Sequence, residues 1–250
     1  MRPMKLFVMD GGKIILPPHH YLGAKKGKGY SIPIPIFLIE HPEGLVLFDT
    51  GPCIENWPDV MKPDGVSAPE QRIDRQLKAL GYSADNVNIV IISHLHLDHA
   101  GGVTFFPNAT FIIRESEFEA AFHNPSGGYV PADYEQAHDF TFIKLPNETD
   151  YDVFGDGRLM CIDTKGHTAG HQSLLVDLPD MGKILIAVDA AQLEEDMSSD
   201  QYPEGQNWSD EWYVRSLAKL RDYKAQQVPI WYGHDPDQFK TLRLTPAFYS

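Results

Sequence analysis

Cysteine and long apolar runs are scarce in this sequence. Its two cysteines, Cys53 and Cys161, lie far apart, so they indicate neither a disulfide framework nor a thiolate metal site. No apolar run approaches the roughly 18 residues that a membrane helix needs. The opening residues also lack an apolar stretch followed by a small-residue cleavage site. We therefore expect a cytoplasmic protein that does not act on membranes.

Basic charge is also scarce. The 21 Lys and Arg residues against 35 Asp and Glu give a formal net charge of −14. Nucleic-acid-binding proteins usually present a basic stripe to the phosphate backbone, whereas the one short basic run here, residues 25–28, is typical of a solvated loop. We expect no nucleic-acid partner. Part of the acidic surplus is available to neutralise divalent cations.

Buried strands are the main structural signal. Short runs rich in Val, Ile and Phe end in polar or Gly-containing turns, as strands of an α/β sheet do. They occupy residues 5–10, 36–40, 45–51, 87–94, 110–115, 159–167, 173–178, 183–190 and 229–234. With 250 residues, of which 42% are hydrophobic, the chain can bury a sizeable core, and we expect one domain over residues 1–250.

Three helices are predicted between these runs. The first begins at Ser67, where Glu70 three residues later completes a capping-box pattern, and it stops at Gly81. The second is short and covers residues 115–122. The third begins near Ser209 and precedes the last apolar run.

Five of the predicted strands end on side chains that can bind a metal or support a ligand: Asp49, His94, His167, Asp189 and His234. Ligand sites of α/β proteins gather at the carboxyl edge of a sheet. The densest group is HLHLDH at residues 94–99, which holds three imidazoles and a carboxylate in six residues. Burying so many polar groups without a cation would be costly. Imidazole and carboxylate ligands suit zinc, and also iron, cobalt or manganese.

The order of these groups resembles a known superfamily. The HxHxDH cluster, Asp49-Thr50-Gly51, Gly166-His167, Asp189 and Gly233-His234 are similar to the five motifs of the metallo-β-lactamase superfamily, and the match spans nearly the whole chain. The resemblance implies an α/β fold, an αββα sandwich of two mixed sheets flanked by helices. It also implies two divalent metal ions, for which we expect zinc.

The same resemblance assigns the ligands. One metal is expected on His94, His96 and His167, and the other on Asp98, His99 and His234, with Asp189 bridging both. Asp49 and His171 are expected to orient ligands without binding metal themselves.

Within the superfamily, residues 93–102, 166–176, 186–191 and 232–243 resemble the N-acyl-homoserine lactone lactonases, the quorum-quenching branch. The chain also resembles 4-pyridoxolactonase, so both interpretations predict a hydrolase that opens a lactone ring. Glyoxalase II-type thioesterases share the HxHxDH cluster but usually add a helical carboxyl-terminal region. Only residues 235–250 follow the last expected ligand here, which makes a thioesterase the less favoured alternative.

The resemblance implies attack on the lactone carbonyl by a hydroxide that bridges the metals, with Asp98 carrying a proton to the departing alkoxide. These lactonases typically have a tyrosine three residues after the bridging aspartate, where this chain has Gln192. A glutamine amide can still donate a hydrogen bond, so we predict a catalytic role for Gln192. For the acyl chain we expect an apolar groove lined by Tyr21, Trp57, Met61, Leu97 and Phe106.

Overall fold

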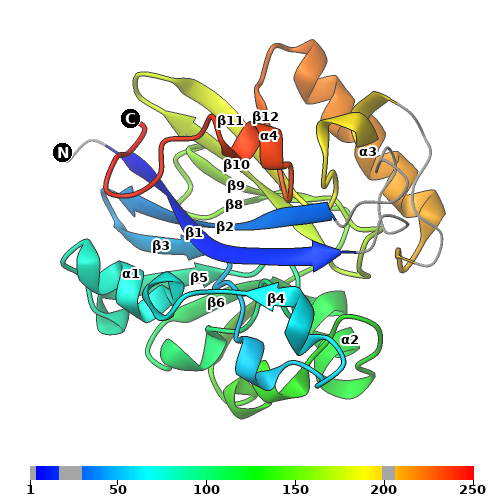
Figure 1. The fold of residues 1–250 in the computed structure, drawn as a ribbon. Helices are drawn as coiled ribbons and strands as arrows, with labels where there is room; N and C mark the ends of the chain where they lie inside the picture. Colours follow the sequence, from blue (N-terminus) through cyan, green and yellow to red (C-terminus); the bar gives the residue numbers. More distant parts are fainter. Residues whose placement is uncertain (1–3, 17–29, 199–205) are drawn as a thin grey trace.

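Two β-sheets carry the architecture of the computed structural model, which describes residues 4–16, 30–198 and 206–250 (Figure 1). The first sheet has the strand order β4-β1-β2-β3-β5-β6-β7. Its strands are β1 (Lys5–Leu16), β2 (Tyr30–His41), β3 (Gly44–Phe48), β4 (Gly65–Val66), β5 (Val87–Ile91), β6 (Thr110–Arg114) and β7 (Thr141–Leu145). The second sheet has the order β12-β11-β10-β9-β8. Its strands are β8 (Tyr151–Asp152), β9 (Leu159–Asp163), β10 (Gln172–Leu178), β11 (Gly182–Val188) and β12 (Ile230–Tyr232).

Both sheets are mixed, as expected. In the first sheet β1, β2 and β3 pair antiparallel, whereas β3, β5, β6 and β7 run parallel to one another. In the second sheet β11 and β12 are parallel and the remaining pairs are antiparallel. Every predicted strand run is found. The short strands β4, β7 and β8 were not predicted, because β7 is mostly exposed and the other two have two residues each.

The sheets stack face to face with helices on their outer faces (Figure 1). Alternation along the strands builds this arrangement, since successive side chains point to opposite faces. In β3, Val46 and Phe48 face the core between the sheets, while Leu45 and Leu47 face the cluster that contains α1 and α2 residues. Residues of β11 likewise alternate between the central core and the cluster under α3. The layers are therefore helix, sheet, sheet and helix, and the predicted αββα sandwich is confirmed.

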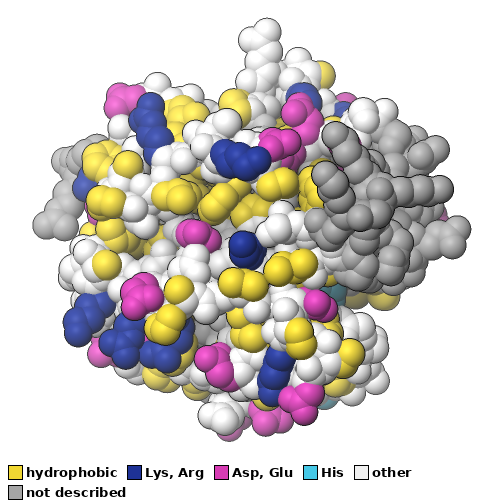
Figure 2. All heavy atoms as spheres, in the orientation of Figure 1, with side chains coloured by type: hydrophobic (Ala, Val, Ile, Leu, Met, Phe, Trp, Pro, Cys, Tyr) yellow, Lys and Arg dark blue, Asp and Glu magenta, His cyan; other side chains and the backbone are white. Residues whose placement is uncertain are grey.

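The helices are α1 (Ile73–Ala79), α2 (Glu115–His123), α3 (Asp210–Ala225) and α4 (Pro236–Phe239). Short 3-10 helices occupy Ile54–Asn56, Lys62–Asp64, Pro69–Gln71, Ala84–Asn86, Val103–Phe105, Pro131–Asp133, Glu135–Ala137 and Glu194–Ser198. None of the helices in the described part of the chain is long and apolar enough to cross a membrane. On the face drawn in Figure 2, the described Lys and Arg side chains lie in small groups among apolar and acidic ones.

The predicted second and third helices agree with α2 and α3, and the Ser209 hydroxyl caps α3 by accepting a hydrogen bond from the Trp212 N–H. The predicted start of the first helix at Ser67 is wrong. Arg72 has an extended backbone, so α1 begins only at Ile73. The preceding turn is closed by the Gln71 side chain, which accepts from the Ala68 N–H, and not by Glu70.

One buried carboxyl group in this framework lacks a full set of partners. Asp133 is 1% exposed, and its Oδ1 accepts a hydrogen bond from Asn56 Nδ2 at 2.8 Å. Its Oδ2 has no hydrogen-bond partner among the described residues. Burial raises the pKa of Asp133 to about 7. The folded protein therefore holds a poorly solvated charge at alkaline pH.

We predict that Asp133→Asn stabilises the protein more at pH 8 than at pH 5, by about 1–3 kcal/mol. Because the folded pKa is raised, the contribution of Asp133 to stability is present below its unfolded pKa near 4 and is lost as the pH rises through about 7. Asparagine keeps an oxygen for Asn56 and carries no charge. Urea denaturation of both proteins at the two pH values measures the difference, and an equal effect at both would contradict the prediction.

Candidate metal centre

The ends of five strands bring the expected ligands together. Strands β3 and β5 lead to Asp49 and to the segment that begins at His94, whereas β9, β11 and β12 of the second sheet lead to His167, Asp189 and His234. These are carboxyl ends of strands from both sheets, so the site forms where the two sheets share an edge. No single segment of the chain could assemble it.

The first group of candidate ligands consists of His94, His96 and His167. One nitrogen from each lies within 4.8 Å of the others. His167 Nε2 is 3.0 Å from His96 Nδ1, and the His94 ring packs edge-on against the rings of both. Three imidazole nitrogens that converge in this way can hold one cation.

The second group consists of Asp98, His99 and His234, again with one ligand atom from each within 4.8 Å of the others. Asp98 Oδ2 lies 3.5 Å from His99 Nε2 and 3.4 Å from His234 Nε2. Asp98 is 8% exposed, so its carboxylate is largely buried beside these two imidazoles.

Asp189 lies between the two groups. Its Oδ1 is 3.1 Å from His234 Nε2 and 3.3 Å from His99 Nε2. Its other oxygen, Oδ2, is 3.3 Å from His167 Nε2. One carboxylate oxygen therefore faces each group, which is the arrangement required of a carboxylate that bridges two metals.

The residues present fit a two-metal centre. His94 Nε2, His99 Nε2 and Asp189 Oδ1 are buried and have no hydrogen-bond partner among the described residues. Buried polar atoms are almost always hydrogen-bonded, so three such atoms in one place indicate a missing partner of another kind. Each offers a lone pair when it carries no proton, and together with the other donors they suit two divalent cations.

Protonation divides the donors into two kinds. Burial lowers the pKa of His96 to about 3 and the pKa of His94 well below its usual value, so both imidazoles are neutral and ready to bind a metal. Burial acts in the same direction on His99, but Asp98 and then Asp189 outweigh it and raise the pKa of His99. A cation that enters the second group therefore displaces a proton.

Asp49 supports His99 from behind. Its Oδ2 accepts hydrogen bonds from His99 Nδ1 at 2.9 Å and from Ser93 Oγ at 2.7 Å, and its Oδ1 accepts from the Ser93 N–H. Because Nδ1 is engaged in this way, Nε2 is the nitrogen of His99 that remains for a metal. The contacts support the orienting role predicted for Asp49.

His171 supports the backbone of the bridging residue. Its Nε2 accepts a hydrogen bond from the Asp189 N–H at 3.2 Å, and its Nδ1 lies 3.1 Å from the Thr164 carbonyl oxygen. Burial lowers the pKa of His171 to about 3, so the ring is neutral and its proton is on Nδ1. Both nitrogens are therefore used, as expected of a residue that orients a ligand and does not bind metal.

Sequence reasoning missed the group that orients His234. The Pro33 carbonyl oxygen of β2 accepts a hydrogen bond from His234 Nδ1 at 2.8 Å, which leaves Nε2 for the metal. Gly233 permits this placement, because a Cβ there would lie 2.7 Å from the Val188 carbonyl group. A backbone carbonyl has no signature in the sequence.

A cavity of about 760 Å³ opens onto the centre, lined in part by His96, Asp98, His167, Asp189 and His234. Its other walls include Ile14, Leu16, Ile32, Trp57, Met61, Leu97 and Gln192. Three of the predicted substrate contacts, Trp57, Met61 and Leu97, thus face the cavity. Phe106 does not, and its prediction as a substrate contact is wrong, because its side chain is 1% exposed and packs in the core beneath α1 and α2. Tyr21 lies outside the described residues.

Gln192 lies at the boundary between the cavity and the ligands. Its Nε2 donates a hydrogen bond to Asp189 Oδ2 at 2.8 Å. The amide therefore contacts the bridging carboxylate directly, a contact that the position of Gln192 in the sequence did not indicate.

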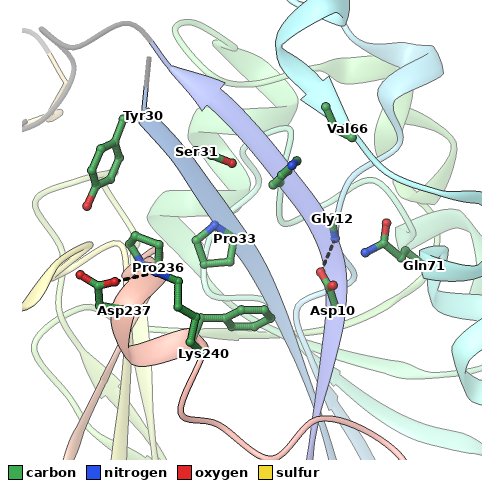
Figure 3. Close-up of a pocket in the computed structure, with 12 residues that line it drawn as sticks. Asp10, Gly12, Tyr30, Ser31, Pro33, Val66, Gln71, Pro236, Asp237 and Lys240 are labelled. Atoms are coloured by element: carbon green, nitrogen blue, oxygen red, sulfur yellow. Dashed lines mark hydrogen bonds and ion pairs between the residues drawn. The ribbon is translucent and has the colours of Figure 1, made fainter. Parts of the chain in front are cut away.

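A second cavity, of about 650 Å³, lies over β1, β2 and α4 (Figure 3). Its charged residues include two that already have partners, since Asp10 accepts a hydrogen bond from the Gly12 N–H and Asp237 pairs with Lys240. The candidate ligands do not line it. We therefore assign the chemistry to the first cavity.

Comparison with known proteins agrees with this centre. Residues 32–226 match the metallo-beta-lactamase superfamily. The chain belongs to this superfamily. It is 37% identical to the N-acyl homoserine lactonase AttM of Rhizobium radiobacter, over 100% of both chains. It is 31% identical to the N-acyl homoserine lactonase AiiA of Bacillus thuringiensis subsp. kurstaki, over 99% of this chain and 100% of that one.

Solved structures of this metallo-β-lactamase branch are also similar. An N-acyl homoserine lactone hydrolase with N-hexanoyl-L-homoserine bound at its catalytic metal centre superposes with a TM-score of 0.86, at 27% identity and over 100% of both chains. An AiiA variant of Bacillus thuringiensis with N-decanoyl-L-homoserine bound gives 0.87, at 28% identity and over 100% of both chains. The predicted superfamily and the resemblance to its lactonase branch are confirmed.

We predict that Asp189→Ala and His96→Ala each lower metal content and hydrolytic activity together. Loss of a direct ligand should cost more than the roughly 10–100-fold typical of residues behind the ligands. Elemental analysis of metal per chain and a hydrolysis assay measure the two effects. His138→Ala, which removes an exposed histidine outside the centre, should leave both unchanged. Full turnover with both metals in Asp189→Ala would contradict the assignment.

Proposed function

We propose that this protein is a metal-dependent lactonase that opens the ring of N-acyl-homoserine lactones, which is a quorum-quenching activity. The observation that carries the proposal is the Asp189 carboxylate, which faces both imidazole groups and lies in the wall of a cavity of about 760 Å³. Hydrolysis of a lactone needs an activated water and a polarised carbonyl, and divalent cations bound by these two groups of residues would supply both. The AttM and AiiA relatives support the substrate class.

We propose zinc as the metal in both groups. The donors are nitrogen and oxygen atoms in which imidazoles predominate, and zinc accepts such ligands in the irregular geometry that catalytic sites require. His94, His96 and His167 would hold one ion, and Asp98, His99 and His234 the other, with Asp189 shared.

Asp98 is the group that moves the proton. It lines the cavity, and its carboxylate keeps one oxygen that is not needed for a metal. Opening the lactone adds the oxygen of water to the carbonyl carbon and breaks the ring C–O bond. Asp98 accepts the proton that the water loses and passes it to the ring oxygen, which leaves as a hydroxyl group.

Gln192 binds the substrate from the side of Asp189. An amide nitrogen carries two N–H groups, and only one of them is used by the hydrogen bond to Asp189 Oδ2. The second is available for the lactone carbonyl oxygen, where negative charge develops as the water adds. Gln192 thus takes the position at which related lactonases have a phenol.

The acyl chain binds along the apolar wall of the cavity. Ile14 and Ile32 come from β1 and β2, and Trp57 with Leu97 completes one packed cluster with them. Trp57 Nε1 donates a hydrogen bond to the Leu97 carbonyl oxygen at 3.1 Å, which holds the aromatic wall against the metal-binding segment.

Two expectations from the sequence stay predictions. They are the location of this reaction in the cytoplasm and a single domain over residues 1–250.

We predict that kcat/KM for N-acyl-homoserine lactones rises with acyl length, by about 2–4-fold for each methylene until the apolar wall is covered. Assays of the zinc-loaded enzyme across short and long acyl chains measure this. The same panel should include simple γ- and δ-lactones, 4-pyridoxolactone and a glutathione thioester. Faster turnover of 4-pyridoxolactone or of the thioester than of every acyl-homoserine lactone would overturn the proposal.

We predict that Gln192→Ala lowers kcat by about 10–100-fold and changes the preference among lactones, because a hydrogen-bond donor to the developing oxyanion is lost. Metal content should stay at the wild-type value. Asn124→Ala is a matched control, since Asn124 is another amide that lines the cavity and, among the described residues, makes no hydrogen bond to a candidate ligand. Loss of a metal in Gln192→Ala would show that the hydrogen bond to Asp189 holds the centre together.

A further inference from the structure

Glu117 is a charged residue of α2 that is completely buried and belongs to none of the ligand motifs. Its Oε1 accepts hydrogen bonds from the Leu95 N–H at 2.9 Å and from the Tyr129 hydroxyl at 2.8 Å. Its Oε2 accepts from the Thr168 hydroxyl at 2.6 Å and from the Gly170 N–H at 3.2 Å. Four donors therefore converge on one carboxylate.

Three of the four donors, Leu95, Thr168 and Gly170, come from the segments that carry the first group of ligands. Leu95 lies between His94 and His96, and Thr168 follows His167 directly. The Tyr129 ring packs edge-on against the His96 ring, with the centroids 4.8 Å apart. Every ligand of this group is thus the neighbour of a residue that Glu117 binds.

The second group is supported by other residues. Asp49 orients His99, and the Pro33 carbonyl oxygen orients His234. Neither of these contacts involves Glu117. Glu117 therefore contacts the first half of the centre alone, whereas Asp49 contacts His99 directly and reaches the first half through Ser93, whose hydroxyl lies 3.0 Å from His94 Nδ1.

The packing around Glu117 leaves little room for adjustment. A Cβ at position 170 would lie 2.4 Å from the Glu117 nitrogen, so only glycine allows the segment after His167 to approach α2 this closely. On the other side, a Cβ at position 128 would lie 2.8 Å from Cγ of His96. The start of α2 is therefore packed closely against the segment after His167, and the His96 ring is packed closely against the backbone that precedes Tyr129.

We propose that Glu117 is a positioning residue for the metal held by His94, His96 and His167, and that it sets the spacing between the two segments that supply this group. The inference rests on the two-metal centre of the proposed function. Charge-assisted hydrogen bonds are about twice as strong as neutral ones, and three of them join the two segments through one residue, while the fourth binds Tyr129 beside His96. Loss of this support loosens the first group and leaves the second in place.

Glu117→Gln tests the proposal, because it preserves the shape of the side chain while placing an N–H₂ group against two of the four donors. We expect the affinity for one of the two zinc ions to fall by about 10–100-fold, and the affinity for the other to stay unchanged. Competition with a chelator resolves the two affinities, and elemental analysis after dialysis should approach one zinc per chain. Thermal unfolding of the metal-free proteins gives a readout that is independent of activity.

Tyr129→Phe and Thr168→Val each remove one donor to Glu117 and keep the side-chain volume. Both substitutions should lower the affinity for the same zinc ion by less than Glu117→Gln does. They test the proposal if the Glu117→Gln variant does not fold. His41→Ala is the matched control for general destabilisation. His41 is also buried, at the opposite end of β2 from Pro33, where its ring stacks on Phe154 and its Nε2 lies 3.1 Å from Asp156 Oδ2. It should lower the unfolding temperature and leave both zinc affinities unchanged.

Two unchanged zinc affinities in Glu117→Gln would overturn the inference, and so would equal weakening of both ions in Glu117→Gln, Tyr129→Phe and Thr168→Val. Either result leaves the lactonase proposal standing, because the wild-type protein still binds two metals. A wild-type protein that binds fewer than two zinc ions would overturn the proposed function itself, and this inference with it.

Discussion

The buried contact between Asp189 and the imidazoles on either side of it is the interaction on which the site depends. Its two oxygens lie 3.1 to 3.3 Å from His234, His99 and His167. Without cations, these lone pairs would be buried at a high cost in solvation energy. With cations, the same burial strengthens each electrostatic contact. The buried donors at the edge shared by the two sheets therefore form a stable site when cations are bound. Without cations they would lower the stability of the folded protein.

The backbone around Asp189 has the conformation that places its carboxylate between the two groups of ligands. Val188 adopts a positive φ of 50°, which is unfavourable for a β-branched residue, at the point where β11 ends. His171, directly before strand β10, accepts a hydrogen bond from the Asp189 N–H. Gly233 lets the end of β12 lie close to Val188. Strain of this kind persists only where the surrounding structure enforces it, and here the rigid sheets supply that constraint.

The contacts behind the ligands also explain how an activity can be adjusted without altering the metals. The ligands are fixed by Asp49, Pro33, His171 and Glu117, none of which lines the cavity. In the proposed function, substrate binds to a different set, the apolar wall and Gln192. Because Gln192 also donates to Asp189, it is the residue through which the two sets are connected. A change of amide to phenol at this position alters both the shape of the cavity and the polarity beside the bridging carboxylate.

The sequence by itself determined the strand runs, two of the three long helices, the superfamily and the expected ligands, because alternating apolar residues and the HxHxDH spacing are local patterns. The sequence could not show whether Phe106 lines the groove or packs in the core, because an aromatic side chain suits both. The structure places it in the core. Nor could it show the start of α1, which depends on the extended backbone of Arg72. The tertiary structure alone decided that Pro33 orients His234, that Gln192 contacts Asp189, and that Glu117 joins the segments of the first group. Each of these contacts links residues distant in the chain or uses a backbone atom, and the position of such atoms is set by how the two sheets pack, which no local pattern records.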